Sequence, residues 1–358
     1  MKIMFYNDDI SIASGGTERV LTNLASQFSN NGHQCIFVTY RKSETEYPLD
    51  SKVQRVVITN NVKRSLSFVQ KLEVMQGIRH IVKAEKPEVL VTFGVGMISR
   101  SLFATIGLPV KNIISYQCSP FWEFRLVKDR WLMRTLHQRT DGIVFQTEEA
   151  KDYLPKRMQA KGKIIYNQVD ERFYDTTYNG ERRDIVSVGR LKGMKNYKML
   201  INAFARISDE ISDNLLIYGT GALYDELQSQ IKELHLENRV FLKGLCNDVP
   251  NAIKSAKLFV LSSDHEGCPN VLMEAMALGI PCVSTACLGG GPQMLFGAEL
   301  KDCLVPANNP QAMADKILEL LRDDEKRNRV ASIGKQKSYS FQPREVFKEW
   351  ESYVMQFK

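Results

Sequence analysis

The sequence predicts an α/β protein of two doubly wound domains, each built on a parallel sheet. Short apolar runs alternate with helical segments along the chain, which is typical of parallel strands joined by helices. The alternation starts again after Asn167, and 358 residues are enough for two domains that each bury a core. We therefore expect Rossmann-like domains over 1–168 and 169–340, facing a central cleft, and a separate C-terminal segment over 341–358.

The first half begins with a strand and a glycine loop. KIMFYN (2–7) is the expected first strand, Gly15 and Gly16 follow it, and an amphipathic helix is expected over about 17–30. Glycines at this place let the backbone approach a ligand closely. The further strands expected in this half are 35–40, 89–93, 112–116 and 142–147.

The second half repeats the pattern after a linker at about 165–175. Its expected strands, with helices between them, are 184–189, 214–219, 239–244, 258–263 and 281–285. In the last segment Phe347, Trp350 and Val354 stand at helical spacing, which predicts a helix at about 341–357.

The most informative stretch is DHEGCPNVLMEAMALGIPC, residues 264–282. Glu266 and Glu274 stand eight positions apart around a Gly-Cys-Pro-Asn corner. A short helix is expected after the corner and should end at Gly279, because Pro281 cannot continue it. Free backbone N–H groups at the start of this helix suit an anionic, oxygen-rich ligand between the two carboxylates.

Two cations, Arg190 and Lys195, follow an expected strand that ends in Gly189. Fixed positive charges beside a glycine turn can neutralise a diphosphate and the charge that grows on it as a group departs. The sequence contains no Asp-x-Asp, and no cluster of His, Asp and Glu suggests a metal site. We therefore expect no metal ion and no other cofactor, with the two cations in the role that a metal often takes.

The E-x7-E spacing resembles the signature of the retaining glycosyltransferases of family four, which have the GT-B fold. Other parts of the chain are similar to that family in the same order: a glycine loop with the first helix, a passage between domains and a diphosphate-binding segment. They are GGTERVLTNLA (15–25), DGIVFQTEEAKDYLP (141–155) with IIYNQVDERF (164–173), and SVGRLKGMKNYKMLINAFARI (187–207). The resemblance covers almost the whole chain.

The resemblance implies a metal-independent, retaining hexosyltransferase. A hexose or N-acetylhexosamine would move from a nucleoside-diphosphate sugar, with UDP the expected nucleotide, to a glycan acceptor. The most similar members extend lipid-linked or capsular oligosaccharides in bacteria, so a polyprenyl-diphosphate-linked acceptor is expected. Residues 1–168 would bind the acceptor and residues 169–340 the donor, and the helix within 341–358 would cross back to the first domain.

The resemblance also implies roles for individual residues. Glu274 corresponds to the acid that binds the ribose, and Glu266 to the acid that contacts the donor sugar and favours positive charge at its anomeric carbon. The expected catalytic residues are Glu266, Arg190 and Lys195. The expected donor-binding residues are Gly15, Gly16, Arg190, Lys195, Gly267, Cys268, Asn270, Val271 and Glu274.

Two stretches depart from the family pattern. SYQCSPFWEF (115–124) has Gln117 and Cys118 where many members have a histidine near the acceptor. STACLGGGPQML (284–295) has Ala286 and Met294 where close relatives often have acidic residues. Two alternatives therefore stay open: a nucleotide-sugar epimerase of the same fold, and a non-catalytic nucleotide-sugar-binding partner of an active transferase.

Positive charge is concentrated in the first half. Residues 1–168 contain 24 Lys and Arg against 15 Asp and Glu, a net +9, whereas 169–358 contain 24 against 26, a net −2. Basic and aromatic residues mix at 62–72 and 121–134, and either a membrane interface or a buried helix explains them. We expect an anionic membrane as a partner and no nucleic acid, since the bases form no dense run. The residues expected on the acceptor or membrane side are Gln117, Arg125, Lys63 and Arg64.

The expected location follows from what the sequence lacks. No run reaches the roughly 18–20 apolar residues of a membrane span, and Asn7, Asp8 and Asp9 do not suit a signal peptide. Seven scattered cysteines without a Cys-x-x-Cys fit a reducing compartment. We therefore expect a cytoplasmic protein that is peripheral on the inner face of the cell membrane.

Overall fold

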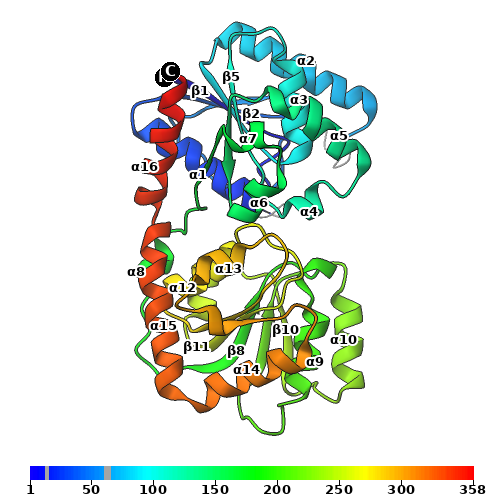
Figure 1. The fold of residues 1–358 in the computed structure, drawn as a ribbon, viewed down its shortest axis with the longest axis vertical. Coiled ribbons are helices and arrows are strands. Elements are labelled where there is room, and N and C mark those ends of the chain that lie inside the picture. The colour runs from blue at the N-terminus through cyan, green and yellow to red at the C-terminus, as the bar shows by residue number, and fades with distance from the viewer. Residues whose placement is uncertain (13–15, 60–65) are drawn as a thin grey trace. The chain divides into compact units, whose positions relative to one another are not determined.

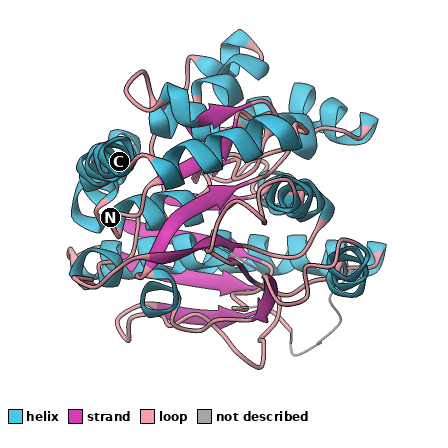
Figure 2. Ribbon diagram, turned by 90° about the horizontal axis from the view of Figure 1, so that it is seen from below, coloured by secondary structure: helices cyan, strands magenta, loops and turns pink. Residues whose placement is uncertain are grey.

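The structure is a computed structural model that describes residues 1–12, 16–59 and 66–358. Contacts divide the chain into two compact units, the first of Met1–Asn167 with Arg344–Lys358 and the second of Gln168–Pro343. Each unit contains one parallel sheet with helices packed around it (Figures 1 and 2). The predicted α/β class, with two Rossmann-like domains, is confirmed.

The first unit has a seven-stranded sheet in the order β3-β2-β1-β4-β5-β6-β7, and all its neighbouring strands are parallel. The strands are β1 Lys2–Asn7, β2 Gln34–Thr39, β3 Gln54–Val57, β4 Val89–Phe93, β5 Lys111–Ser115, β6 Gly142–Phe145 and β7 Gly162–Ile164. The five expected strands correspond to β1, β2, β4, β5 and β6. The sequence missed the two edge strands, β3 and β7, because they are short and half-buried and lack a long apolar run.

The helices of the first unit cover both faces of its sheet. They are α1 Gly16–Asn30, α2 Phe68–Glu85, α3 Val95–Ala104, α4 Pro120–Glu123, α5 Val127–Thr135, α6 Glu148–Tyr153, α7 Lys156–Gln159 and α16 Pro343–Val354. Helices α1 and α16 share one core cluster with the sheet, and α2 contributes to the cluster on the other face.

The C-terminal helix α16 is part of the first unit's core. The Phe347 ring lies 5.0 Å from the Phe28 ring of α1, and the Trp350 ring lies 5.7 Å from that of Phe93 in β4, measured between centroids. The Tyr353 hydroxyl accepts a hydrogen bond of 2.8 Å from the backbone N–H of Ile143 in β6. Residues that are far apart in the sequence are thus joined in one apolar cluster.

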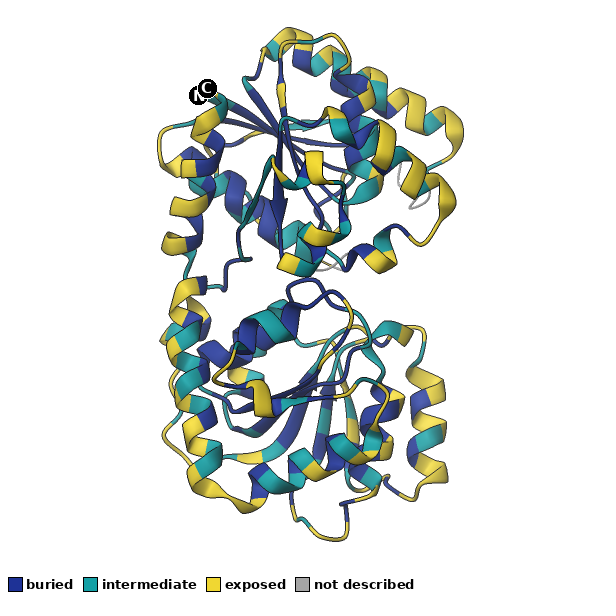
Figure 3. Cartoon of the chain, viewed as in Figure 1, coloured by how far each residue is buried: buried dark blue, intermediate teal, exposed yellow. Residues whose placement is uncertain are grey.

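The second unit has a six-stranded parallel sheet in the order β10-β9-β8-β11-β12-β13. Its strands are β8 Arg183–Val188, β9 Leu215–Tyr218, β10 Val240–Gly244, β11 Ala256–Leu261, β12 Cys282–Thr285 and β13 Leu304–Val305. All but β13 were expected, and two residues are too short a run to predict. The central strands of both sheets are buried (Figure 3).

The helices of the second unit include the one that carries Glu274. They are α8 Arg172–Asp175, α9 Tyr197–Ala205, α10 Tyr224–Glu233, α11 Val249–Ile253, α12 Asn270–Ala277, α13 Gly291–Phe296, α14 Pro310–Arg322 and α15 Asp324–Ser338. Helix α12 contacts β11, β12 and α15, whereas α9 contacts α10 and α14.

Each sheet has one point at which the strand order reverses, between β1 and β4 in the first unit and between β8 and β11 in the second. In open parallel α/β sheets, ligands bind outside the carboxyl ends of the strands at such a point. The loops that follow β8 and β11, together with helix α12, contain seven of the nine residues that the sequence predicted to bind the donor. The fold therefore brings these two loops together at one edge of the sheet.

Candidate active site

An ion pair joins the loops after β8 and β11. Lys195 ends a short 3-10 turn, η2 Gly193–Lys195, and its Nζ lies 2.6 Å from Oε1 of Glu266. The Ser263 hydroxyl donates a second hydrogen bond of 2.6 Å to the same carboxylate oxygen. The two charged side chains are only 17% and 9% exposed, so their attraction is less screened by water than that of a surface pair.

Hydrogen bonds to backbone carbonyls fix the loops around this pair. The N–H of Asp264 donates to the carbonyl of Met194 at 2.9 Å, and the Ser262 hydroxyl donates to the carbonyl of Lys195 at 2.8 Å. The loop after β12 joins them, because the N–H of Leu288 donates to Asp264 and the N–H of Glu266 donates to Leu288. Three strand-end loops therefore form one connected structure.

Glu274 lies inside α12, the eight-residue helix after the corner. Glu274 is only 3% exposed, so it does not lie on a solvated face of the helix. The helix ends as the sequence predicted: Gly279 N–H donates to Met276 O at 2.9 Å, and Ile280 N–H donates to Ala275 O at 3.0 Å. This double hydrogen bond is the Schellman arrangement, in which glycine accommodates the left-handed residue after the helix.

The Gly-Cys-Pro-Asn corner is tightly packed. Gly267 and Cys268 are buried, while Asn270 and Val271 are half-buried at the start of α12. A Cβ on Gly291, the first residue of α13, would stand 1.7 Å from the carbonyl oxygen of Gly267. Only glycine allows the two backbones to approach so closely.

Arg190 differs from Lys195 in burial. It follows Gly189 directly beyond the end of β8, and its side chain is exposed. The backbone of its neighbour Leu191 is held by an N–H···O bond of 2.9 Å to Thr220 after β9. The structure thus places one cation in the connected loops and one at their solvent-exposed edge.

The residues predicted on the first unit lie on separate elements. Gly16 is the first residue of α1, and Gln117 follows β5, where its amide donates to the Ser115 hydroxyl at 2.9 Å. Arg125 lies between α4 and α5, and its guanidinium carbon is 4.1 Å from the centre of the Trp122 ring. Three predicted residues lie outside the described part of the chain: Gly15, Lys63 and Arg64.

Sequence reasoning missed a buried titratable cluster beside Gln117. Burial raises the pKa of Glu123 to about 8, although its carboxyl accepts backbone hydrogen bonds from 117–118. Burial lowers the pKa of His137 to about 4, and its Nδ1 lies 2.8 Å from the Tyr116 hydroxyl. Glu123 stands in a stretch rich in aromatic and basic residues, and nothing in that pattern indicated that its side chain turns inward.

Apolar side chains are exposed on α4, α5 and the turn between them. Val127 is 74% and Trp131 is 62% exposed, and the bases Arg125 and Lys128 in the same stretch are also exposed. The other large exposed apolar residues of this surface are Phe121, Trp122 and Leu126. No helix in the described residues is long and apolar enough to cross a membrane.

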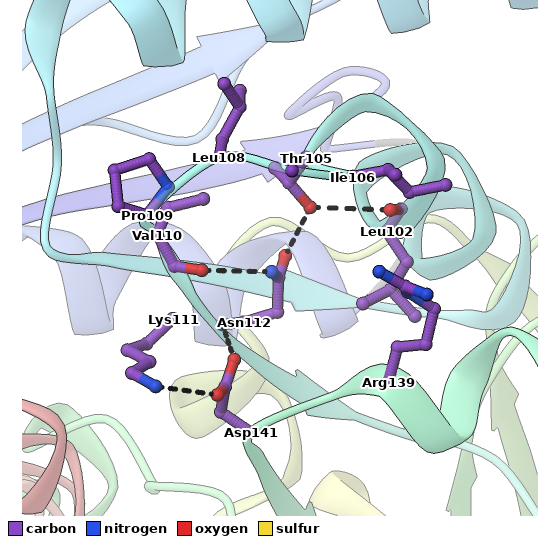
Figure 4. Close-up of a pocket in the computed structure, with 11 residues that line it drawn as sticks. Leu102, Thr105, Ile106, Leu108, Pro109, Val110, Lys111, Asn112, Arg139 and Asp141 are labelled. Atoms are coloured by element: carbon purple, nitrogen blue, oxygen red, sulfur yellow. Dashed lines mark hydrogen bonds and ion pairs between the residues drawn. The ribbon is translucent and has the colours of Figure 1, made fainter.

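A pocket of about 350 Å³ lies at the opposite edge of the first sheet, beside the amino ends of β5 and β6 (Figure 4). Its polar groups bond to one another: Asp141 accepts from the Asn112 N–H at 2.9 Å and from Lys111 Nζ at 3.1 Å. None of the predicted site residues lines it. Within the described residues, no three His, Cys, Asp or Glu side chains are grouped so that they could hold a metal ion.

Two family models match the chain, and between them they span nearly all of it. The description of the first is Glycosyltransferase Family 4, over residues 14–173, and that of the second is Glycosyl transferases group 1, over residues 169–337. The chain belongs to the family-four glycosyltransferases. This glycosyltransferase has the GT-B fold of the family, as its two parallel-sheet units show.

Relatives match over the full length of this glycosyltransferase. It is 25% identical to a Campylobacter jejuni alpha-1,4-N-acetyl-D-galactosaminyltransferase whose named substrate is a diphospho-undecaprenol-linked glycan, over 100% of this chain and 99% of the relative. It is 23% identical to the amylovoran biosynthesis glycosyltransferase AmsD of Erwinia amylovora, over 98% of both chains. The crystal structure of Anabaena HepE with UDP superposes with a TM-score of 0.81 at 18% identity, over 99% of this chain and 100% of HepE.

Proposed function

We propose that this glycosyltransferase transfers a hexose or N-acetylhexosamine, with retention, from a UDP-sugar to a glycan hydroxyl. The contact between Lys195 and Glu266 carries the proposal. It brings a cation and a carboxylate together beyond the carboxyl ends of β8 and β11, the neighbouring strands between which the strand order reverses. That point of a parallel sheet is the expected place for a nucleotide. Glu274, on the helix that follows, adds a second, buried carboxylate.

The chemistry of the donor assigns a role to each charged group. Glu274 would accept hydrogen bonds from the ribose hydroxyls, and Glu266 would accept them from the sugar and favour positive charge at its anomeric carbon. Lys195 and Arg190 would neutralise the diphosphate as it leaves. Within the second unit, the backbone beside the donor would come from the Gly267–Val271 corner.

Retention without a covalent intermediate suits these groups. The anomeric carbon would lose its bond to the phosphate oxygen and gain a bond to the acceptor oxygen on the same face. The acceptor's proton would pass to the departing phosphate, so no protein base is needed. In this mechanism two fixed cations offset the growing charge, and we propose that the transfer is independent of metal ions.

The proposed acceptor is a polyprenyl-diphosphate-linked glycan at the inner face of the cell membrane, used in bacterial surface polysaccharide or glycan synthesis. The Campylobacter relative supports this, since its name specifies a diphospho-undecaprenol glycan. The first unit would bind this acceptor, near Gln117 and Arg125. The exposed tryptophans and bases of α4 and α5 suit contact with an anionic lipid surface.

A donor panel tests the function directly. UDP- and GDP-sugars would be screened for a rise in melting temperature, because a ligand that binds only the folded state stabilises it. Donors that bind would then be assayed with undecaprenyl-diphosphate-linked glycans, with and without a strong chelator. We expect a UDP-sugar to bind and to be transferred in the chelator.

Each alternative gives a different result in the same assays. Conversion of the donor sugar without an acceptor would indicate an epimerase. Donor binding without turnover on any acceptor would indicate a binding subunit. Loss of both binding and turnover in the chelator, restored by a divalent ion, would contradict the metal-independent mechanism.

A further inference from the structure

The side chain of Asn196 links three loops of the second unit. Its Oδ1 accepts the N–H of Met199 at 3.2 Å and so caps the start of α9. Its Nδ2 donates to Oδ1 of Asp264, after β11, at 2.8 Å and to Oδ1 of Asn308, after β13, at 2.6 Å. One amide therefore uses an acceptor and a donor group at once, and it joins loops that start from different strands.

These bonds lie next to both members of the ion pair. Asn196 directly follows Lys195, and Asp264 stands two residues before Glu266. The backbone of Asn196 is left-handed, with φ +48°, a conformation that asparagine adopts more readily than most residues. A side chain here must tolerate that backbone, accept one hydrogen bond and donate two, which an asparagine does and an aspartate cannot.

We propose that Asn196 is a positioning residue that holds Lys195 against Glu266 and sets where the ammonium meets the donor diphosphate. The expected effect on turnover rests on the proposed function. The hydrogen bonds that would hold Lys195 in place are a feature of the structure alone. The simpler possibility is that Asn196 only caps α9. The two possibilities differ, because the cap uses the amide oxygen whereas the positioning uses the amide nitrogen.

Asn196→Asp separates the two roles. Aspartate keeps the capping oxygen, the size and the tolerance for this backbone, but it sets a carboxylate against Asp264 and removes the donor. We expect turnover at saturating donor to fall at least tenfold, since small displacements of a charged group are costly in a preorganised site. Asn309→Asp is the matched control, because Asn309, the neighbour of Asn308, caps α14 through its Oδ1, and no side-chain bond from it to Asn196 or Asp264 is among those described.

Exchange of the two partners should restore activity. In Asn196→Asp/Asp264→Asn the amide stands on the other loop, so the hydrogen bond returns with its direction reversed and the repulsion is gone. We expect turnover to recover to within about threefold of the starting protein, a rescue that a cap alone does not predict. Wild-type turnover in Asn196→Asp, or no recovery in a double variant that melts normally, would overturn the proposal.

A second measurement does not depend on transferase activity. The coupling between Lys195→Met and Glu266→Gln can be obtained from urea unfolding. Each substitution changes the unfolding equilibrium constant by some factor, and the coupling is the factor by which the double variant departs from the product of the two single-variant factors. We expect this factor to fall toward one in the Asn196→Asp background and to persist in Asn309→Asp. Persistence in both backgrounds would refute the positioning role, whereas an inactive wild-type protein would refute only the proposed function.

Discussion

Lys195 and Glu266 neutralise each other across 2.6 Å in the second unit. In the proposed reaction the Lys195 ammonium must contact the diphosphate and the Glu266 carboxylate must contact the sugar. The donor would therefore replace, for each side chain, the contact that the other side chain makes now. Both groups are largely shielded from water, and removing either leaves the other desolvated and with fewer partners. Substitutions here should therefore affect both turnover and stability.

We predict that Lys195→Ala and Arg190→Ala each lower turnover by about a hundredfold. Loss of a preorganised charge on a leaving group is worth about 3 kcal/mol. Lys195→Ala should also lower the free energy of unfolding by about 2 kcal/mol. The Arg190 side chain is exposed, so Arg190→Ala should change the free energy of unfolding by less than about 0.5 kcal/mol. Steady-state assays and urea unfolding measure both effects.

The exposed Lys198, which pairs with Glu226 on α10, provides the matched control for these lysine and arginine substitutions. Lys198→Ala should keep near-normal turnover. If Lys195→Ala and Arg190→Ala also keep near-normal turnover, their assignment to the diphosphate is wrong.

We predict that Glu274→Ala chiefly weakens donor binding and that Glu266→Ala chiefly lowers turnover. Ribose contacts stabilise the ground state and the transition state alike, whereas contacts at the reacting sugar strengthen as charge develops. Kinetics at varied donor concentration separate KM from kcat. The reverse pattern would mean that the two glutamates have exchanged roles.

Most residues of the candidate site were predictable, because their signal is local. Glu266, Glu274, Arg190 and Lys195 stand in short stretches at fixed spacing. Asn196 was not singled out, because its partners Asp264 and Asn308 are 68 and 112 residues away and meet it only in the folded sheet. A single sequence does not reveal such contacts.

At the scale of elements, local signals in the sequence identified the central strands and missed most of the edge strands. The central strands are buried on both faces, so their apolar runs identified them. Of the four edge strands, β10 was expected from its sequence, whereas β3, β7 and β13 are short or half-buried, and pairing with a neighbour rather than composition makes them strands. Helix α12 was predicted well because Gly279 and Pro281 mark its end.

We expect the loop and short helix after β5 to make the stability of the first unit depend on pH. Burial raises the pKa of Glu123 from the ordinary 4.5 to about 8, so the folded state binds its proton more tightly than the unfolded state does. That contribution is fully present below about pH 4.5 and is lost as the pH rises to about 8. One buried oxygen of this carboxyl has no hydrogen-bond partner among the described residues, which makes its charged form costly.

We predict that Glu123→Gln removes this alkaline loss. Glutamine stays neutral, so the variant should exceed the starting protein in unfolding free energy by roughly 4–5 kcal/mol at pH 8.5 and by less than about 1 kcal/mol at pH 5. Urea unfolding across this pH range provides the difference curve. His137, whose pKa burial lowers to about 4, gives both proteins the same loss below about pH 6.5 and does not affect the difference. A difference that does not change with pH would contradict the inward, proton-binding position of Glu123.

At the scale of the whole molecule, the two units differ in charge. The first contains 27 Lys and Arg against 18 Asp and Glu, a net +9, and the second contains 21 against 23, a net −2. The exposed apolar surface of α4 and α5 belongs to the positive unit. Aromatic side chains among bases are typical of proteins that lie on an anionic lipid surface.

We predict that the protein binds anionic vesicles reversibly and that salt weakens the binding. Each base near the surface adds roughly 1 kcal/mol, and this attraction is screened beyond a Debye length of about 10 Å at 0.1 M salt. Arg125→Glu/Lys128→Glu should release the protein from the vesicles, and Trp131→Ala should weaken binding even at higher salt, because the indole contributes apolar rather than charge contact. Co-sedimentation with vesicles at several salt concentrations measures each effect.

The control for the vesicle experiment makes the same charge change on the other unit. Lys232→Glu/Lys243→Glu alters two exposed lysines of the second unit, and we expect it to leave vesicle binding within about twofold of the starting protein. Donor binding should be unchanged in Arg125→Glu/Lys128→Glu, since the proposed donor residues Lys195, Glu266 and Glu274 belong to the second unit. If the starting protein does not sediment with anionic vesicles at low salt, the membrane proposal fails. The transferase proposal would stand in that case, with a soluble acceptor in place of a lipid-linked one.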